Sequence, residues 1–388
     1  MDAQTRVLRT LSHQEPDKVP MFESTFTNDT IMKDYGVKPG HLGPLYRVLT
    51  YLPFRHKILN FTLSKKGLVQ KGLESMAELY RKAGIDIFPT VTSLFPRKIL
   101  KDGFIDEFGR HMHFEYYKDG TEIIGYVDGY FDSFEVYESW ELPDPSAEMR
   151  MAGYLAGKEL QDKHPDDLFC LPATSGLMEC TWEGFGLKTF SRLLQKRSQA
   201  KKVFDDRGKF TLEVIKRLSE KGAKAILIFD DYGFKNGLFM RPAYYEDYIF
   251  PWLSCICSAA HKNGCKILLH SDGDLTEILD GLINTCHIDG LNPIEPTTAN
   301  PNYDIFKIHE KYGDKITLIG NVPPNMLSTG ELSEIESYSK KLLQTIGPGG
   351  GYILASGHSI NPAVTPDRWK KMVEARDTYG TYPIQGSS

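Results

Sequence analysis

Side chains able to act as acids, bases or metal ligands stand at the ends of short apolar runs along this chain. Those of clearest position are Glu23, Asp86, Asp230, Asp231, Tyr232, His270, Asp272, Asn292, Glu295, Asn321, Ser356 and His358. Burying a carboxylate in apolar surroundings is unfavourable unless a cation, a donor or a ligand compensates it. The ends of these runs carry no Arg or Lys, and Lys235 and Arg241 follow only in a later loop. The pattern therefore predicts a functional site rather than a set of structural ion pairs.

One group of these residues has the spacing of a metal site. His270 and Asp272 are two positions apart, which places both side chains on one face of an extended strand. Glu295 follows the next apolar run, so three N and O ligands would converge and leave a coordination position open, as in a catalytic zinc site. Two alternatives remain open: an oriented His–Asp pair acting as a general base, and a histidine that is only hydrogen-bonded in the rim of a pocket.

The other polar groups are assigned by position. We expect a catalytic role for Glu23, Asp230, Asp231 and His358. We expect substrate contacts from Asp86, Tyr232, Asn292 and Asn321. A structural alternative stands beside two of these assignments, because Asp86, and one of Asp230 and Asp231, could instead cap a helix.

Eight apolar, β-rich runs position these residues, and amphipathic helical stretches separate them. The runs cover residues 19–24, 86–91, 168–173, 225–230, 266–270, 290–294, 316–320 and 351–356. Nearly continuous apolar strands that alternate with helices indicate a parallel sheet buried on both faces. Eight of them predict an α/β fold of the (β/α)₈ TIM-barrel type, with its site at the C-terminal ends of the strands. A doubly wound open sheet is the rival, but no Gly-rich phosphate loop follows the first run.

Two segments interrupt this rhythm. Residues 28–85 are helical and aromatic, and residues 95–142 alternate like hairpins, with turns predicted at Asp102-Gly103, Asp119-Gly120 and Asp128-Gly129. Both segments follow one of the first two strands, so we expect them to be insertions that shape the substrate pocket. No Pro/Ser-rich linker divides the chain, which predicts one domain over residues 1–388.

The composition limits the partners and the compartment. A net charge of -5 gives no electrostatic reason to expect binding to nucleic acid or to an anionic membrane. The chain has no run of about 18 uncharged apolar residues, and its N-terminal segment lacks the apolar core of a signal peptide. We therefore expect a cytoplasmic protein. Its six cysteines, including the pair Cys255 and Cys257, are then expected to be free, buried thiols.

Three segments carry a resemblance to a known family. HSDGDLTEILDGLINTCHIDGLNPIEP, KYGDKITLIGNV and ASGHSINPAVTPDRWKKMVEA resemble the uroporphyrinogen decarboxylase superfamily, over roughly residues 165–380. The closing pattern Gly-His-x-Ile-x-Pro-x-x-x-Pro is quite specific to that superfamily. The resemblance implies a (β/α)₈ barrel.

The superfamily contains two kinds of chemistry. Its decarboxylases use no metal, and an Arg-rich N-terminal motif binds the carboxylates of their substrate. Asp86 and His358 match residues of that branch, but the first strand here continues as MFESTFTND, without arginine. A polycarboxylate substrate needs cationic partners. A metal-free lyase acting on a different carboxylate therefore stays the second candidate, ahead of a binding protein or inactive relative on the same barrel.

The other branch contains corrinoid-dependent methyltransferases, which hold zinc on a His-x-Cys motif and a late Cys. The zinc enzymes of cobalamin-independent methionine synthesis add a Glu. His270 matches the histidine, Asp272 stands in place of the first cysteine, Glu295 matches the glutamate, and Ser356 lies near the position of the late cysteine. Oxygen ligands leave zinc harder and more electrophilic than thiolates do, which suits polarising an ether oxygen.

The resemblance thus implies a zinc-dependent methyltransferase that demethylates a small methoxylated aromatic. The methyl group would pass to Co(I) of a separate corrinoid protein, and a homodimer is possible. Aromatic side chains in the insertions and loops would suit such a donor: Tyr46, Phe54, Phe61, Phe95, Tyr232, Phe234 and Phe239.

Overall fold

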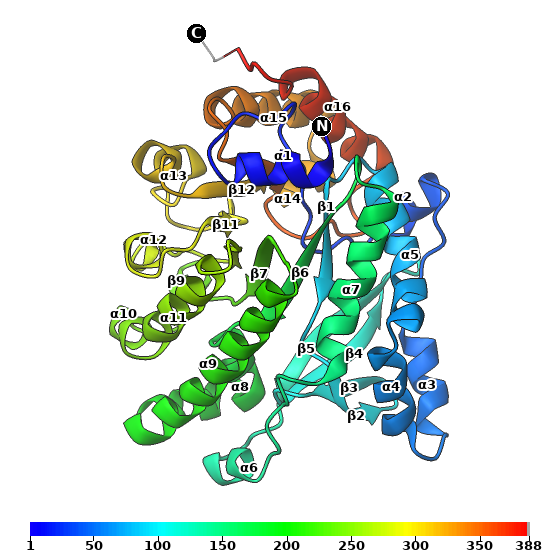
Figure 1. Cartoon of the computed structure of the whole chain (residues 1–388), viewed down its shortest axis with the longest axis vertical. Helices are drawn as coiled ribbons and strands as arrows, with labels where there is room; N and C mark the ends of the chain where they lie inside the picture. Colours follow the sequence, from blue (N-terminus) through cyan, green and yellow to red (C-terminus); the bar gives the residue numbers. More distant parts are fainter. Residues whose placement is uncertain (386–388) are drawn as a thin grey trace.

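The computed structural model describes residues 1–385 and is built around a curved parallel sheet of seven strands, wrapped by helices (Figure 1). Every neighbouring pair is parallel, and the strands lie side by side in chain order. They are β1 (Ile87–Val91), β6 (Phe169–Ser175), β7 (Ala225–Phe229), β10 (Lys266–His270), β11 (Gly290–Asn292), β12 (Thr317–Val322) and β13 (Tyr352–Ser356). The predicted α/β barrel is confirmed.

The first of the eight predicted strands is not regular, yet it closes the ring. Met21 bridges Leu354 of β13, and Phe22 bridges Ile87 of β1. The Phe22 N–H donates to the carbonyl of Leu354 at 3.0 Å, and the Asp86 N–H donates to that of Met21 at 3.1 Å. Pro20 has no N–H to add to the ladder, so this segment makes bridges rather than a strand.

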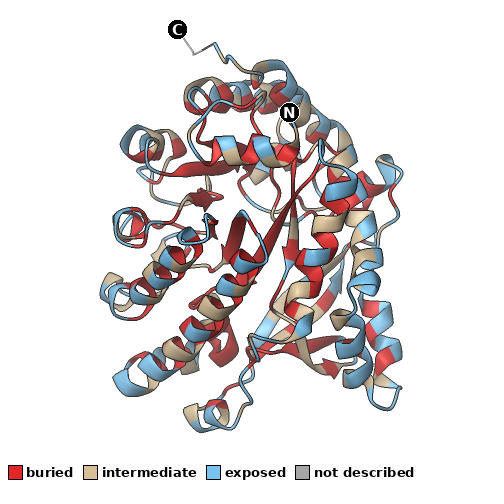
Figure 2. Ribbon diagram, in the orientation of Figure 1, coloured by how far each residue is buried: buried red, intermediate tan, exposed pale blue. Residues whose placement is uncertain are grey.

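The helices that follow the strands cover the sheet, and their buried sides face it (Figure 2). They are α7 (Glu148–Lys163), α8 (Glu179–Leu194), α9 (Arg197–Glu220), α10 (Pro242–Tyr244) with a π-helical turn at Tyr245–Ile249, α11 (Phe250–His261), α12 (Leu279–Asn284), α13 (Ile305–Tyr312), α14 (Pro324–Thr329), α15 (Leu332–Ile346) and α16 (Pro366–Tyr379). Helix α1 (Ala3–Thr10) lies near the N-terminal end of β6, where the Ala3 N–H donates to the carbonyl of Pro165. A short hairpin, β8 (Gly233–Phe234) and β9 (Gly237–Leu238), follows β7.

The two interrupting segments pack on one another. The first contains α2 (Asp29–Asp34), α3 (Gly43–Thr50), α4 (Arg55–Ser64) and α5 (Lys66–Lys82). The second is an antiparallel sheet of β2 (Pro96–Leu100), β3 (Gly103–Asp106), β4 (Arg110–Tyr116) and β5 (Glu122–Gly129), followed by α6 (Phe134–Glu138). Side chains of α3, α4 and this sheet share a separate small core. Helix α5 instead contacts α7 and β1, so it belongs to the outer ring of the barrel rather than to an insertion.

One predicted turn is wrong. Asp128 and Gly129 end strand β5, where they pair with His111 and Arg110. The chain instead reverses between β3 and β4, at Glu107–Gly109, where Gly109 has a φ of 83°. In this turn the Asp106 carboxylate accepts the N–H groups of Phe108 and Arg110. Gly129 is required for another reason: a Cβ there would lie 2.2 Å from the backbone nitrogen of Gly186 in α8.

The cysteines match the expectation in five positions of six. All six are free and five are buried, whereas Cys255 is exposed on α11. The α-helical turn points Cys255 outward while its neighbours Ile256 and Cys257 face the core. Among residues 1–385, no helix combines the length and apolar character needed to cross a membrane.

Candidate active site

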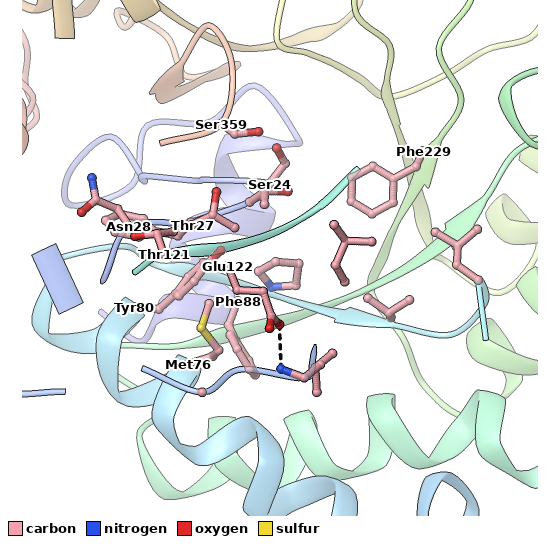
Figure 3. A pocket seen from close by; sticks show the side chains of 18 of the residues that line it. Ser24, Thr27, Asn28, Met76, Tyr80, Phe88, Thr121, Glu122, Phe229 and Ser359 are labelled. Carbon is pink, nitrogen blue, oxygen red and sulfur yellow. Dashed lines mark hydrogen bonds between the residues drawn. The ribbon is translucent and has the colours of Figure 1, made fainter. Parts of the chain in front are cut away.

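A cavity of about 780 Å³ opens at the C-terminal ends of the strands. Figure 3 shows that its walls come from distant parts of the chain: the loop after the first barrel segment (Ser24, Thr27, Asn28), α5 (Met76, Tyr80), β1 (Phe88) and β7 (Phe229). Residues 40–42 and Thr121, Glu122 and Ile124 of the interrupting segments also line it. Both interrupting segments therefore contribute residues to the wall of this cavity.

The cavity is apolar along its walls and acidic at two places. Its apolar side chains include Phe26, Met32, Met76, Phe88 and Phe229. Its carboxylates are Asp29, Glu122, Glu179, Asp231 and Asp272, and none of its lining residues within residues 1–385 is Lys or Arg. Asp29 and Glu122 already have partners, because Asp29 contacts His41 at 3.0 Å and Glu122 accepts the N–H groups of Leu42 and Gly43. Of the other three carboxylates, Glu179 lies 3.4 Å from the Arg110 guanidinium, whereas Asp231 and Asp272 have no Arg or Lys within ion-pairing distance among residues 1–385.

Strand register brings two of those carboxylates to His270. Strands β7 and β10 are parallel neighbours, with Phe229 opposite His270. Asp231 and Asp272 each follow by two residues, so they also arrive side by side. Ligand atoms of Asp231, His270 and Asp272 all lie within 4.8 Å of one another. The Asp272 N–H donates to Asp231 at 2.8 Å, while Oδ1 of Asp272 is buried with no hydrogen-bond partner among residues 1–385.

The electrostatics of this cluster favour a bound cation. Burial and the nearby carboxylates of Glu179 and Asp272 hold the pKa of Asp231 well above its usual value. Carboxylates that face one another without a cation must either keep a proton or bind a positive ion. One imidazole and two carboxylates form a donor set that suits zinc and leaves coordination positions for a substrate.

Asn292 orients the histidine. Its Nδ2 donates to the carbonyl of Ile319 at 3.2 Å, which turns Oδ1 toward Nδ1 of His270 at 2.6 Å. Because an amide oxygen only accepts, Nδ1 carries the hydrogen and Nε2 keeps its lone pair for a metal. Asn292 is buried and does not line the cavity. It is therefore a positioning residue, and its predicted substrate contact is wrong.

Glu295 does not join the cluster, which corrects the predicted ligand set. One of its oxygens accepts the Gly273 N–H at 2.8 Å, and the other accepts the Thr297 hydroxyl. Strand β11 ends at Asn292, and Ile294 then has a φ of 54°, which turns the chain away from the strand direction. Glu295 thus holds the loop that carries Asp272, and Asp231 takes the place expected for it.

Asp86 lies outside the cavity lining. It precedes β1, in which the lining begins at Phe88, two residues further along. Its carboxylate accepts hydrogen bonds from Arg6 at 2.7 Å, from Arg376 at 3.1 Å and from the Met21 N–H at 2.8 Å. The predicted substrate contact of Asp86 is wrong. Its negative charge is instead compensated by these two arginines, which lie far from it in the sequence.

Asp230 and Tyr232 flank Asp231 but point away from the cavity. Asp230 accepts the N–H groups of Leu177, Met178 and Glu179 at 2.7–2.8 Å, so it caps the start of α8. Burial raises its pKa to about 7 against the effect of these donors. Tyr232 is wholly buried, with its ring 5.5 Å from that of Tyr245. The capping alternative therefore describes Asp230, and neither residue lines the cavity.

Asn321 is also structural. Its Nδ2 donates to the carbonyl of Ile294 at 2.8 Å, and its Oδ1 accepts the Tyr338 hydroxyl at 3.0 Å. It is buried and lies outside the cavity lining. Its side chain ties β12 to the loop after β11, so the predicted substrate contact is wrong.

Two of the remaining predicted catalytic residues differ in exposure. His358 lines the cavity, half exposed, with Nε2 3.6 Å from Oδ2 of Asp272. Glu23 is buried behind the cavity wall, where it accepts the N–H of Ser356 at 2.8 Å and contacts the Ser356 hydroxyl. Of these two, only His358 can reach a molecule in the cavity.

Glu23 gives a test of stability against pH. Burial raises its pKa from 4.5 to about 8, so the folded state keeps a proton that the unfolded state releases. Its contribution to stability is complete below about pH 4.5 and is lost as the pH rises towards 8, by up to about 1.4 kcal/mol per pH unit.

Gln resembles the protonated acid and would donate to the Ser356 hydroxyl. We expect Glu23→Gln to gain stability over the wild type at that rate between pH 5 and 8, measured by urea unfolding with a chelator present. A constant difference across that range would contradict it.

The sequence did not lead us to Glu179 or to the buried ion pairs that Arg110 makes beside it. Glu179 begins α8, directly beyond β6, and lines the cavity. Buried Arg110 of β4 contacts Glu183 at 2.8 Å, Asp106 at 2.6 Å and Glu179 at 3.4 Å. Burial raises the pKa of Glu183 to about 7. The carboxyl group four residues after the third strand was a usable signal for Glu179; nothing in the sequence indicated that Arg110 would reach it.

Comparison with known proteins places the chain in a family. The family model "Uroporphyrinogen decarboxylase (URO-D)" matches residues 177–379, over half of the chain. Uroporphyrinogen decarboxylase of Colwellia psychrerythraea is 38% identical over 73 residues, 19% of this chain and 20% of that protein. The enzyme of Schizosaccharomyces pombe is 38% identical over 68 residues, 17% and 19% of the two chains. The chain thus matches about a fifth of the length of these relatives.

A solved structure extends the likeness to the whole fold. A methyltransferase from Methanosarcina mazei superposes with a TM-score of 0.67 at 20% identity, over 98% of this chain and 99% of that one. At this identity the likeness concerns the fold. The matched family model means that this chain belongs to the uroporphyrinogen decarboxylase family, and the superposition shows that it shares its fold with this methyltransferase.

Proposed function

We propose that the chain is a zinc-dependent methyltransferase that takes a methyl group from a small, uncharged methoxylated aromatic and passes it to Co(I) of a corrinoid protein. One observation carries the proposal: Asp231, His270 and Asp272 converge at an apolar cavity that no Lys or Arg lines among residues 1–385. The fold shared with a methyltransferase supports it.

The three converging residues fit a zinc ion. The unpartnered buried oxygen of Asp272, the imidazole nitrogen that Asn292 leaves free and the carboxylate of Asp231 would hold it. When bound, zinc would act as a Lewis acid that neutralises charge on a departing oxygen.

The chain's own residues would bind and orient the donor. Phe88 and Phe229 would present apolar surface to an aromatic ring. His358 stands where it can protonate the aryl oxide as it leaves. A Co(I) corrinoid would supply both electrons of the new bond to the methyl carbon, and the electron pair of the broken C–O bond would stay on the aryl oxygen, which His358 would protonate.

The cavity lining argues against a decarboxylase acting on a polycarboxylate. Such a substrate would meet five carboxylates and no cation along this wall. For the same reason we expect a methoxyphenol to be preferred over a methoxybenzoate of equal size. A lyase for another substrate remains the second candidate.

The test combines metal analysis with turnover. Protein purified without chelator or affinity metal should contain about one zinc per chain, in accord with a single donor set, and should methylate free Co(I) cobalamin from a methoxyphenol. The matching methoxybenzoate should react at least about tenfold more slowly. Folded protein that neither contains nor takes up zinc, and that demethylates no ether, would reject the proposal.

A further inference from the structure

Residues 35–73 are unusual in charge for this chain. They contain seven basic residues and no Asp or Glu, although the whole chain has a net charge of -5. The basic residues are Lys38, Arg47, Arg55, Lys57, Lys65, Lys66 and Lys71. The segment forms the loop before α3, both short helices α3 and α4, and the start of α5. It therefore presents positive charge on an otherwise acidic molecule.

Helices α3 and α4 are apolar on two sides. Their inner sides bury Tyr46, Leu49 and Leu59 against the antiparallel sheet. Their outer sides and the turn between them expose a second apolar set, here named the α3–α4 face: Leu42, Leu45, Val48, Tyr51, Phe54, Ile58 and Phe61. Tyr51 is 82% exposed, Phe54 73% and Phe61 58%. Contiguous exposed apolar surface of this kind is typical of a binding surface.

Lysines accompany the exposed aromatic rings. The Lys57 ammonium lies 5.5 Å from the centre of the Phe54 ring, and that of Lys65 lies 5.2 Å from the Phe61 ring. Within residues 1–385, no carboxylate lies within ion-pairing distance of Lys57 or Lys65. Aromatic side chains in the centre and charges around them are typical of protein interfaces, and these charges would select an acidic partner.

The α3–α4 face reaches the mouth of the cavity. Leu42 is exposed and also lines the cavity, beside His41. Exposed Ile124 of β5 lines it from the neighbouring sheet. A macromolecule that covers this face would therefore stand next to the bound donor.

We propose that the α3–α4 face docks the corrinoid-carrying protein, through an acidic surface with an apolar centre. The inference rests on the proposed function, in which cobalt must come into bonding contact with the methyl carbon and so must be presented at the cavity mouth. A lipid surface would cover the mouth without presenting a metal. A second copy of this chain would block the mouth for the partner.

The test measures binding rather than turnover. The probe is the small corrinoid protein encoded nearest to this chain's gene, loaded with hydroxocobalamin, with binding followed by biolayer interferometry at low and high NaCl. We expect binding that weakens with salt. The variants Tyr51→Ser with Phe54→Ser, and Lys57→Glu with Lys65→Glu, should each weaken it about tenfold or more.

A matched control changes the same kinds of exposed side chain elsewhere. Leu332→Ser with Lys340→Glu alters α15, which lies at the opposite end of the molecule from α4 (Figure 1), and should bind like the wild type. Unchanged thermal unfolding of every variant establishes that the fold is kept.

Several results would overturn the docking surface: no binding by the wild type, equal binding by the α3–α4 variants, or sedimentation with phosphatidylserine vesicles that the variants lose. Methyl transfer to free Co(I) cobalamin without binding of the corrinoid protein would contradict the docking surface alone. Binding that the variants lose, with no methyl transfer from any donor, would support the surface and contradict the proposed function.

Discussion

Replacing Asp86 with Asn should lower the free energy of unfolding by about 3–5 kcal/mol, the range for breaking a buried ion pair from one side. Arg6 and Arg376 are both buried, and Asp86 accepts a hydrogen bond from each, at 2.7 and 3.1 Å. An amide removes the negative charge and leaves two guanidinium groups facing each other across it. The loss should appear in urea unfolding followed by circular dichroism.

Asp17 provides the control. It also accepts two hydrogen bonds from Arg6, both at 2.8 Å, but its side chain is 37% exposed. Water screens that pair, so Asp17→Asn should lose only about 1 kcal/mol. Zinc content and methyl transfer per folded molecule should be unchanged in both variants. An Asp86→Asn protein of normal stability that has lost donor binding would return Asp86 to the substrate site.

The contrast between Asp86 and β10 shows how far the sequence predicts this fold. The strand predicted at residues 266–270 is β10 itself, because a run of Ile and Leu buried on both faces has few other solutions. The barrel order follows from eight such runs. The partners of Asp86, by contrast, are 80 and 290 residues away along the chain. Only the closed barrel brings α1 and α16 together beneath β1.

The site residues that could be predicted are those whose direction follows from the alternation of side chains along a strand. His270 and Asp272 face the cavity because they continue one strand face, and His358 lines it from the loop after the last strand. Tyr232 and Asn321 fail because both are buried and turn into the packing outside the cavity, where Asn321 accepts a hydrogen bond from Tyr338. Glu295 fails because Ile294 breaks the strand direction before it. Neighbouring-strand register, which no sequence pattern supplied, is what brings Asp231 to His270.

Asp231→Asn should therefore reduce kcat/KM by about a thousandfold or more and prevent stoichiometric zinc binding. Removing a ligand from the metal forfeits several kcal/mol of charge stabilisation on the leaving oxygen. Asn is nearly the same shape and still presents an oxygen to the Asp272 N–H, now 2.8 Å from Asp231 Oδ1, so the loop should stay in place. Zinc content by mass spectrometry and initial rates with a methoxyphenol are the measurements.

Glu295→Gln is the matched comparison, because it changes a carboxylate to an amide in the adjacent loop. Gln can still accept the Gly273 N–H, which Glu295 binds at 2.8 Å, so only the support of the loop is weakened. We expect a loss within about tenfold, the low end for residues behind a metal ligand. The opposite order, with Glu295→Gln losing zinc and Asp231→Asn keeping it, would assign the metal to His270, Asp272 and Glu295. Equal, small effects of both changes would mean that no metal depends on either carboxylate, and catalysis would then have to rest on His270 and His358 alone.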